Sequence, residues 1–188
     1  MAPSPESAAQ KRPLSLDAII DASVRIADAE GLNGVSIRRV AAAIAARPMS
    51  LYSFIESKDD LVARMLDSVI GDILVEKLPH DWRTAVESIA RRTIEVGAKH
   101  PWIIEATAQS NSAGPNALAH ERQTLDALAS LGADSARTRS LAMAIDVYTI
   151  GFAMVSGGAS GAPSDDRVFT DGLTWLLNGF EHEQDRRS

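Results

Sequence analysis

Apolar residues recur every three or four positions along almost the whole chain, and this spacing permits few folds other than a helical one. The first such run comprises Leu16, Ile19, Ile20, Val24 and Ala27 and ends at Gly31. This spacing places the apolar side chains on one face of a helix, whereas a half-buried strand would alternate apolar and polar residues. No segment alternates convincingly in that way. We therefore predict an all-α fold.

Capping residues and helix breakers set the expected limits of the helices. Serines precede three of the apolar runs as candidate N-caps, at positions 15, 36 and 57, and Pro48 suits the first turn of a short helix. After Pro79 we expect further helices that begin near residues 81, 100, 114 and 134, and a last helix over about residues 165–181. The Gly-rich segment 157–166 is predicted to be a flexible connector, and residues 1–13 a mobile arm.

Composition excludes several classes of protein. The chain has 188 residues, 45% of them hydrophobic, and no cysteine, which excludes a disulfide framework and Cys-based zinc sites. Its most apolar run without charge, residues 147–164, contains four glycines and Pro163, so we do not expect a membrane span. No basic leader precedes an apolar segment, so we predict a cytoplasmic protein without membrane contact.

The pair of short helices predicted around the Ala45-Ala46 turn forms a candidate helix-turn-helix, because a preceding helix can brace them. On the second helix, residues 47–54, the first turn would meet base edges, and Ser50 and Tyr52 could donate to phosphates. Lys58, at the start of the next helix, could bind an adjacent phosphate. The chain carries a net charge of −6, but residues 34–58 hold four cations against Glu56 alone. The alternatives are a solvated basic helix face and, for Tyr52 and above all Phe54, a place in the core.

The segment "LDAIIDASVRIADAEGLNGVSIRRVAAAIAARPMSLYSFIESKDDLVARML" resembles the DNA-binding domain of the TetR (tetracycline-repressor) family. The resemblance, together with the predicted short helix over residues 47–54, implies a set of residues that contact DNA. They are Ser36, Arg38, Arg47, Pro48, Met49, Ser50, Tyr52, Ser53 and Lys58. Two features depart from the family pattern, namely the Ala45-Ala46 turn and Arg47. The turn usually reads Gly-Val, and Ala45 tolerates a positive φ poorly, so we expect a less regular turn. Arg47 stands where Ser is frequent, which leaves the recognition helix without a good cap.

The C-terminal part resembles the branch of that family nearest the tetracycline repressor, through "HDWRTAVESIARRTIEVGAKHPWIIE", "GPNAL" and "DVYTIGF". This resemblance implies a helical core that holds a small molecule, and a dimer contact made by the last two long helices. We accordingly predict a DNA-binding domain over residues 14–60 and a ligand-binding and dimerisation domain over residues 61–188. The apolar stripes of the last two helices predict a dimer interface that includes Leu141, Phe152, Val155, Phe169, Leu173 and Leu176. The alternative is that a stripe belongs to the core of one chain.

Candidate ligand-binding residues lie in the middle of the second domain, where the sequence has large apolar side chains and few charged ones. They are Trp102, Glu105, Gln109, Asn116, His120, Asp146 and Tyr148. Flat aromatic faces and neutral hydrogen-bonding groups predict an aromatic or polycyclic, largely uncharged inducer. For Asp146, the alternative is a satisfied charge at a helix end near the core.

Signs of catalysis are missing from the sequence. The four histidines lack metal-ligand spacing, and the chain has no Gly-rich phosphate loop and no nucleophile elbow. We therefore predict neither an enzyme nor a bound cofactor or metal. The sequence favours a homodimeric, ligand-responsive repressor that binds a palindromic operator in double-stranded DNA and releases it on binding a small molecule. The alternatives are a helical small-molecule-binding protein without operator binding, and an enzyme whose catalytic groups the sequence does not reveal.

Overall fold

All regular structure in the described part of the chain is helical, as the spacing of apolar residues predicts. The computed structural model describes residues 13–110, 113–156 and 166–186. The helices are α1 (Leu16–Glu30), α2 (Ile37–Ala43), α3 (Pro48–Leu51), α4 (Lys58–Gly71), α5 (Trp82–Lys99), α6 (Ile103–Gln109), α7 (Pro115–Leu128), α8 (Ser135–Ser156) and α9 (Asp166–Asp185). The predicted arm, except Pro13, and the predicted connector, except Asp166, lie outside the described residues.

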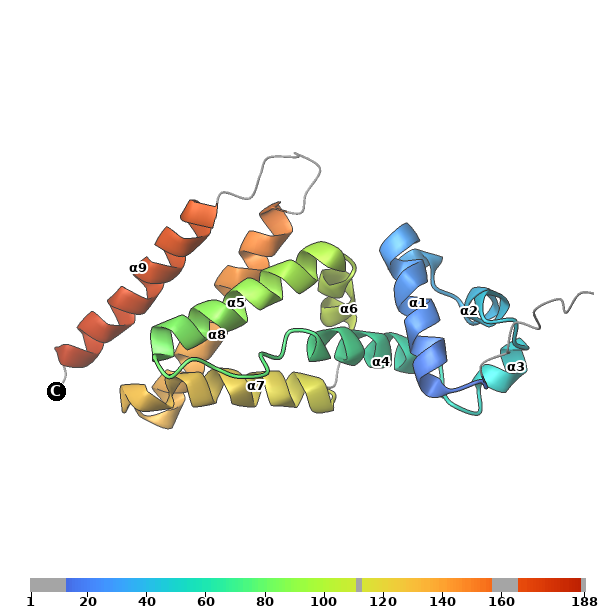
Figure 1. Ribbon diagram of the computed structural model, residues 1–188, viewed down its shortest axis with the longest axis horizontal. Coiled ribbons are helices and arrows are strands. Elements are labelled where there is room, and N and C mark those ends of the chain that lie inside the picture. The colour runs from blue at the N-terminus through green and yellow to red at the C-terminus, as the bar shows by residue number, and fades with distance from the viewer. Residues whose placement is uncertain (1–12, 111–112, 157–165, 187–188) are drawn as a thin grey trace, which may run out of the picture.

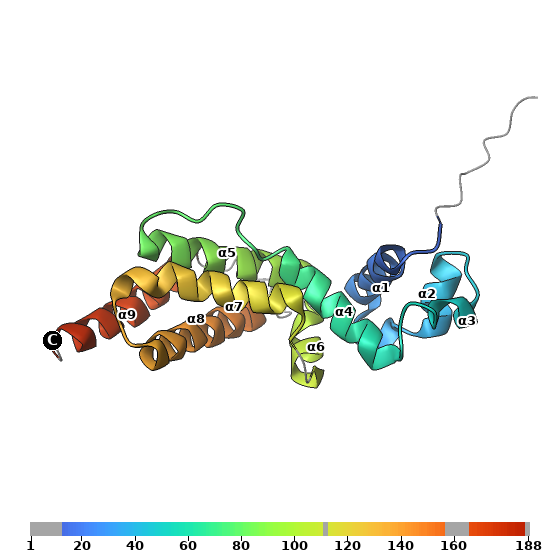
Figure 2. The same ribbon diagram turned by 90° about the horizontal axis from the view of Figure 1, so that it is seen from below.

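The molecule is elongated, with two groups of helices joined by α4 (Figure 1). Residues 13–57, with α1, α2 and α3, form one end and are called the head below. Helices α5, α7, α8 and α9 form the larger group, called the bundle. Figure 2 shows α4 running from the head toward the bundle, with α6 beside it. No helix in the described ranges is long and apolar enough to cross a membrane. Gly151, one of the glycines expected to break the apolar run, lies inside α8 and does not interrupt it.

The predicted N-caps begin their helices as expected. The hydroxyl oxygens of Ser15, Ser36 and Ser57 accept hydrogen bonds from the backbone N–H three residues later, at 3.2, 3.3 and 3.0 Å. The carboxylate of Asp81 accepts in the same way from the N–H of Thr84 at 2.9 Å. Each of these side chains pairs a backbone donor that the helix itself leaves without a partner. These limits follow from local sequence alone, which explains why they were predictable.

The turn between α2 and α3 is regular, contrary to our expectation. Its Ala45 has φ 53°, and it is the only residue other than glycine with a positive φ among the residues that the structure describes. The N–H of Ala46 donates to the carbonyl of Ala41 at 2.8 Å, which closes the turn. The close packing of α2 against α3 thus imposes a left-handed conformation that Ala adopts at a cost of about 1–2 kcal/mol.

Replacing Ala45 with glycine should therefore stabilise the protein by about 0.5–1 kcal/mol, since glycine relieves this strain but is more flexible when unfolded. The midpoint of urea denaturation, followed by circular dichroism, measures the change. Ala46→Gly is the matched control because Ala46 has no positive φ. It should lower the midpoint. Equal losses in both variants would show that the turn is not strained at Ala45.

The buried apolar residues form two clusters that divide the helices unevenly. The first contains the core of the head and the buried face of α4, together with Val96, Trp102 and Ala106 from the end of α5 and from α6. The second lies between α5, α7, α8 and α9. Helix α6 therefore packs its buried residues with the head, although it follows α5 in the chain. The head and the bundle are therefore joined at α4 and α6.

Candidate DNA-binding surface and ligand site

Helix α3 turns its polar residues outward because one apolar side chain anchors it. Leu51 is fully buried in the head, and Ile55, just after the helix, is buried beside it. Met49 and Tyr52 are exposed, with 77% and 48% of their surface accessible. The helix begins with Pro48, and no side chain caps its first turn, as expected for an Arg at the N-cap position. Phe54 is half-buried against the core of the head.

Three cations of the predicted DNA-binding set are available to an anion. Arg38, Arg47 and Lys58 are exposed and form no ion pair with any residue that the structure describes. Arg39 differs from them because it pairs with Glu30 of α1. Lys58 is the first residue of α4, so its charge lies beside backbone N–H groups that point out of the helix. Ser36 and Ser53 are exposed and Ser50 is half-buried on the same segment.

A groove of about 540 Å³ runs between α1 and the turn that precedes α3. Arg25 and Asp21 of α1 line it together with Arg47 and Ser50. Arg25 belongs to the exposed side of α1, and sequence reasoning did not select it because helical periodicity shows only that it is exposed. Its proximity to the recognition helix depends on the packing of α1 against α2. The groove therefore adds a further cation beside the predicted base-reading residues.

The predicted ligand-binding residues do not converge on one site. Asn116 begins α7 and attaches it to α4: its backbone N–H donates to the Asp67 carboxylate, and its amide donates to the Asp67 carbonyl, both at 3.0 Å. The N–H of Ala117 donates to the same carboxylate at 3.0 Å, so Asp67 caps α7 from another helix. A Cβ at Gly114 would overlap the Asp67 side chain, so this contact requires glycine there. Asn116 is thus part of a joint between helices.

Trp102 is also part of a joint. It is 4% exposed, and its indole N–H donates to the Asp28 carboxylate of α1 at 2.7 Å. Glu105 and Gln109 are exposed on α6 and hydrogen-bond to each other at 3.2 Å. These three residues therefore lie on the side of the molecule where α6 meets the head.

His120 and Asp146 do approach each other between α7 and α8, with 3.8 Å from Nε2 to Oδ1. Asp146 lies in the middle of α8, so it is not a helix-end charge. The structure adds Thr149, one helical turn after Asp146, which sequence reasoning missed because an isolated Thr carries no pattern. The Thr149 hydroxyl and His120 Nδ1 are buried without a hydrogen-bond partner among the described residues. Such groups destabilise a fold by about 1–3 kcal/mol each, which marks them as candidates for a binding role.

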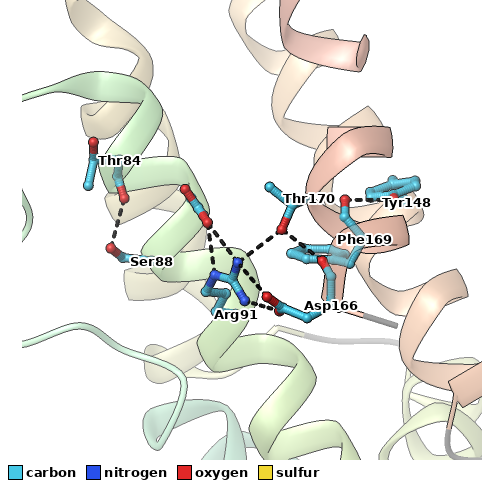
Figure 3. A network of polar contacts seen from close by, with 8 residues as sticks. Thr84, Ser88, Arg91, Tyr148, Asp166, Phe169 and Thr170 are labelled. Carbon is cyan, nitrogen blue, oxygen red and sulfur yellow. Dashed lines mark hydrogen bonds and ion pairs between the residues drawn. The ribbon is translucent and has the colours of Figure 1, made fainter. Parts of the chain in front are cut away.

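Tyr148 points toward α9 and fixes that helix to α8 (Figure 3). Its hydroxyl donates to the carbonyl of Phe169 at 2.9 Å, and its ring stacks on Phe169 with 5.6 Å between centroids. Burial raises the pKa of Tyr148, and the nearby Asp171 charge raises it further. A Cβ at Gly172 would overlap the Tyr148 hydroxyl, so the absence of a side chain at Gly172 leaves room for the Tyr148 ring.

Arg91 of α5 fixes the beginning of α9 from the other side (Figure 3). Its guanidinium pairs with Asp166 and with Glu87, and it donates to the hydroxyl of Thr170 at 3.0 Å. The hydrogen bond from Arg91 lowers the pKa of Asp166, and the same pairing raises the pKa of Arg91. Helix α9 is therefore held in a defined orientation, with one face inward and one face outward.

The inward face contradicts part of the predicted dimer interface. Leu141, Phe169 and Leu173 are buried in the second cluster of a single chain, so they have almost no surface left to cover. Phe152 and Leu176 are half-buried against the same cluster, and of the predicted set only Val155 is fully exposed. The intramolecular alternative thus holds for the buried residues.

The outward faces of α8 and α9 carry a second set of apolar residues, which we call the outer apolar face. On α8 the set recurs every three or four residues, and on α9 it includes an indole ring that is 72% exposed. The members are Met143, Val147, Ile150, Met154, Val168 and Trp175. Large exposed apolar patches mark interaction sites in soluble proteins.

Comparisons with known proteins agree with this architecture. Residues 76–167 match the family described as "Tetracyclin repressor-like, C-terminal domain". The HTH-type transcriptional repressor DrrR1 of Streptomyces coeruleorubidus is 36% identical over 148 residues, which are 76% of this chain and 54% of DrrR1. The chain thus spans about half the length of this curated relative.

Solved structures share the fold at lower identity. ActR of Streptomyces coelicolor, without ligand, superposes with a TM-score of 0.80 at 21% identity, over 94% of this chain and 99% of ActR. ActR in complex with actinorhodin gives 0.76 at 21% identity, over 90% and 97%. BioQ bound to its natural double-stranded DNA operator gives 0.71 at 20% identity, over 90% and 99%. These likenesses show a shared fold, and the family match over residues 76–167 together with the 36% identity to DrrR1 shows that the chain belongs to the TetR (tetracycline-repressor) family.

Proposed function

We propose that the protein is a homodimeric, ligand-responsive transcriptional repressor that binds a palindromic operator. The observation that carries this proposal is the exposed α3, flanked by Arg38, Arg47 and Lys58, which form no ion pair with any described residue, in a fold shared with ActR and BioQ. The BioQ complex with its operator and the name of DrrR1 as a repressor support it. Such a protein acts by binding alone, in the cytoplasm where the DNA is. Residues 14–60 are its DNA-binding domain, and residues 61–188 are its ligand-binding and dimerisation domain.

In this proposal α3 enters the major groove with its first turn. Arg47 and Met49 meet base edges, because a guanidinium forms paired hydrogen bonds with guanine and a thioether offers an apolar contact. Ser36, Arg38, Ser50, Tyr52 and Ser53 contact phosphates, and Pro48 sets the direction of the helix. Lys58 binds a phosphate at the N-terminus of α4. Arg25, which lines the same groove as Arg47, joins this set as a further phosphate contact.

Selection of binding sites from a random DNA pool tests the proposal. We expect enrichment of a two-fold symmetric motif whose half-sites lie about one helical turn apart. Enrichment without a two-fold related motif, or no enrichment, would contradict the proposal and favour a small-molecule-binding protein without operator binding.

Arg47→Ala should weaken binding to the selected operator by about 1–3 kcal/mol and relax the preference at one base pair. Lys58→Ala should weaken binding to all sequences alike and reduce the salt dependence by roughly one counterion, since its contact is with a phosphate. Titrations at several salt concentrations measure both effects. Arg122→Ala is the control, because it removes the same charge from the exposed side of α7. If Lys58→Ala changed base preference while Arg47→Ala did not, the assigned roles would be wrong.

The outer apolar face is the proposed dimer interface. Helices α8 and α9 of each chain would pair with those of the partner as a four-helix bundle around a two-fold axis. Val155 remains in the interface, at the end of α8. Phe152 and Leu176, half-buried in one chain, would support the interface from below.

For the ligand, we propose a site between α7 and α8 that includes His120, Asp146 and Thr149. The Thr149 hydroxyl and the His120 imidazole, with the Asp146 carboxylate as a further acceptor, offer hydrogen bonds beside apolar side chains, and we take this to favour a largely uncharged aromatic or polycyclic compound. The complex of ActR with actinorhodin supports ligand binding in this fold. Ligand binding would reach the DNA-binding domain through the contacts of Trp102 and Asn116. By linkage, the ligand must lower the affinity for the operator by the same factor by which the operator lowers the affinity for the ligand.

A further inference from the structure

One carboxylate oxygen of the head binds two side chains from the corner between α5 and α6. Asp28 Oδ1 lies 2.7 Å from the indole Nε1 of Trp102 and 2.6 Å from Nδ1 of His100. A carboxylate only accepts, so the imidazole carries its proton on Nδ1 and donates. Asp28 is in α1, more than 70 residues earlier in the chain. The contact therefore joins the head directly to the rest of the protein.

Both donors are almost completely buried. His100 is 3% exposed and Trp102 is 4% exposed, and their rings meet edge to face with centroids 6.1 Å apart. Trp102 and Ala106 also contribute apolar surface to the core of the head. Apolar packing is not directional, so by itself it would let the head turn on α6. Hydrogen bonds are directional, and two buried donors that lose their acceptor are costly. The shared oxygen thus favours a single orientation of the head.

We propose that Asp28 is a positioning residue that sets the distance between the two recognition helices of the dimer. The inference rests on the proposed function, because it requires an operator-binding dimer. Two half-sites must face the protein about one helical turn, roughly 34–36 Å, apart. Helix α3 lies at the far side of the head from α6 (Figure 1). A small rotation about the Asp28 contact would therefore displace α3 relative to a bound DNA. Asp28 thereby determines which half-site spacing the protein accepts, without a base contact of its own.

The experiment uses the selected palindrome and two versions whose half-sites are moved one base pair closer or farther apart. The wild type should bind the altered DNAs much more weakly than the palindrome. Asp28→Ala should reduce this spacing penalty by about tenfold or more, because a loosely held head can follow the shifted half-site. Trp102→Phe keeps the packing and removes one donor, so it should reduce the penalty less.

Two controls isolate the hydrogen bonds. Asp28→Asn retains an acceptor oxygen and should keep the penalty within about threefold of the wild-type value. Asp17→Ala removes the same charge from the exposed side of α1 and should leave the penalty unchanged. The penalty is a ratio between two DNAs for one protein preparation, so a partly unfolded variant does not alter it.

If both Asp28→Ala and Trp102→Phe kept the wild-type spacing penalty, this inference would be overturned and the proposed function would stand. Failure of the wild type to bind any palindrome would overturn the proposed function, and this inference with it.

Discussion

Placing glutamates at Val147 and Trp175 together should split the dimer into monomers and remove tight operator binding. Both side chains are exposed on the outer apolar face, so the free chain tolerates the charges. A two-fold contact would bury four carboxylates close to one another, at a cost of several kcal/mol. We expect the dimer dissociation constant to rise by about a thousandfold or more. Operator affinity should fall by about 10²–10⁴, because two linked heads bind far more tightly than one.

Sedimentation velocity at micromolar concentration, with circular dichroism to confirm folding, measures this effect. Leu118→Glu is the matched control: Leu118 is a large exposed apolar residue of α7, outside the outer apolar face. That variant should remain dimeric. A double variant that sediments as the wild-type dimer would show that the chains pair through another surface.

Phe169→Ala should lower the free energy of unfolding by about 3–5 kcal/mol, the range for removing a buried aromatic ring. Phe169 is 1% exposed and lies against the rings of Tyr148 and Phe152, with centroids 5.6 and 5.1 Å away. Urea denaturation at fixed protein concentration gives the value. Leu118→Ala, which shortens an exposed apolar side chain of α7 outside the outer apolar face, should cost much less. If Phe169→Ala split the dimer while each chain kept its stability, Phe169 would belong to the interface after all.

The head was predictable from sequence because its signals are local. Ser15 and Ser36 cap their helices, and the order of α1, α2 and α3 follows from runs of apolar residues separated by short breaks. The strained residue of the turn, Ala45, occupies the position at which the family pattern has glycine. Two details differed. The turn is regular because packing of the neighbouring helices overrides the preference of one alanine, and the second helix, predicted over residues 47–54, spans only Pro48–Leu51.

The outer apolar face, our proposed dimer interface, was not predictable, because α8 is apolar on both sides. Leu141 and Ile145 face the core, while Met143 and Val147 face outward, and both sets have helical spacing. A helix that is hydrophobic all round carries little information about which face meets which partner. On α9 the inward stripe was recognised, but its buried members pack in the core of a single chain, and the outward side carries only two large apolar residues among those described, Val168 and Trp175.

The candidate ligand residues were uncertain for a different reason, namely that their partners are distant in sequence. Trp102 and Asn116 looked available for a ligand because nothing nearby in the chain pairs with them. Their partners are Asp28 and Asp67, 74 and 49 positions away. Helical periodicity is a property of one segment, so it cannot reveal which polar side chain is already bonded across the fold.

The capping of α7 by Asp67 also bears on how the chain folds. Most helices here carry their own cap, but the first turn of α7 pairs its N–H groups with a carboxylate on α4. That turn is stable only once α4 has docked, and α4 in turn supplies buried residues to the core of the head. Helix α7 therefore cannot complete its folding independently of α4. The head and the bundle are bound into one cooperative folding unit, although each has a hydrophobic core of its own.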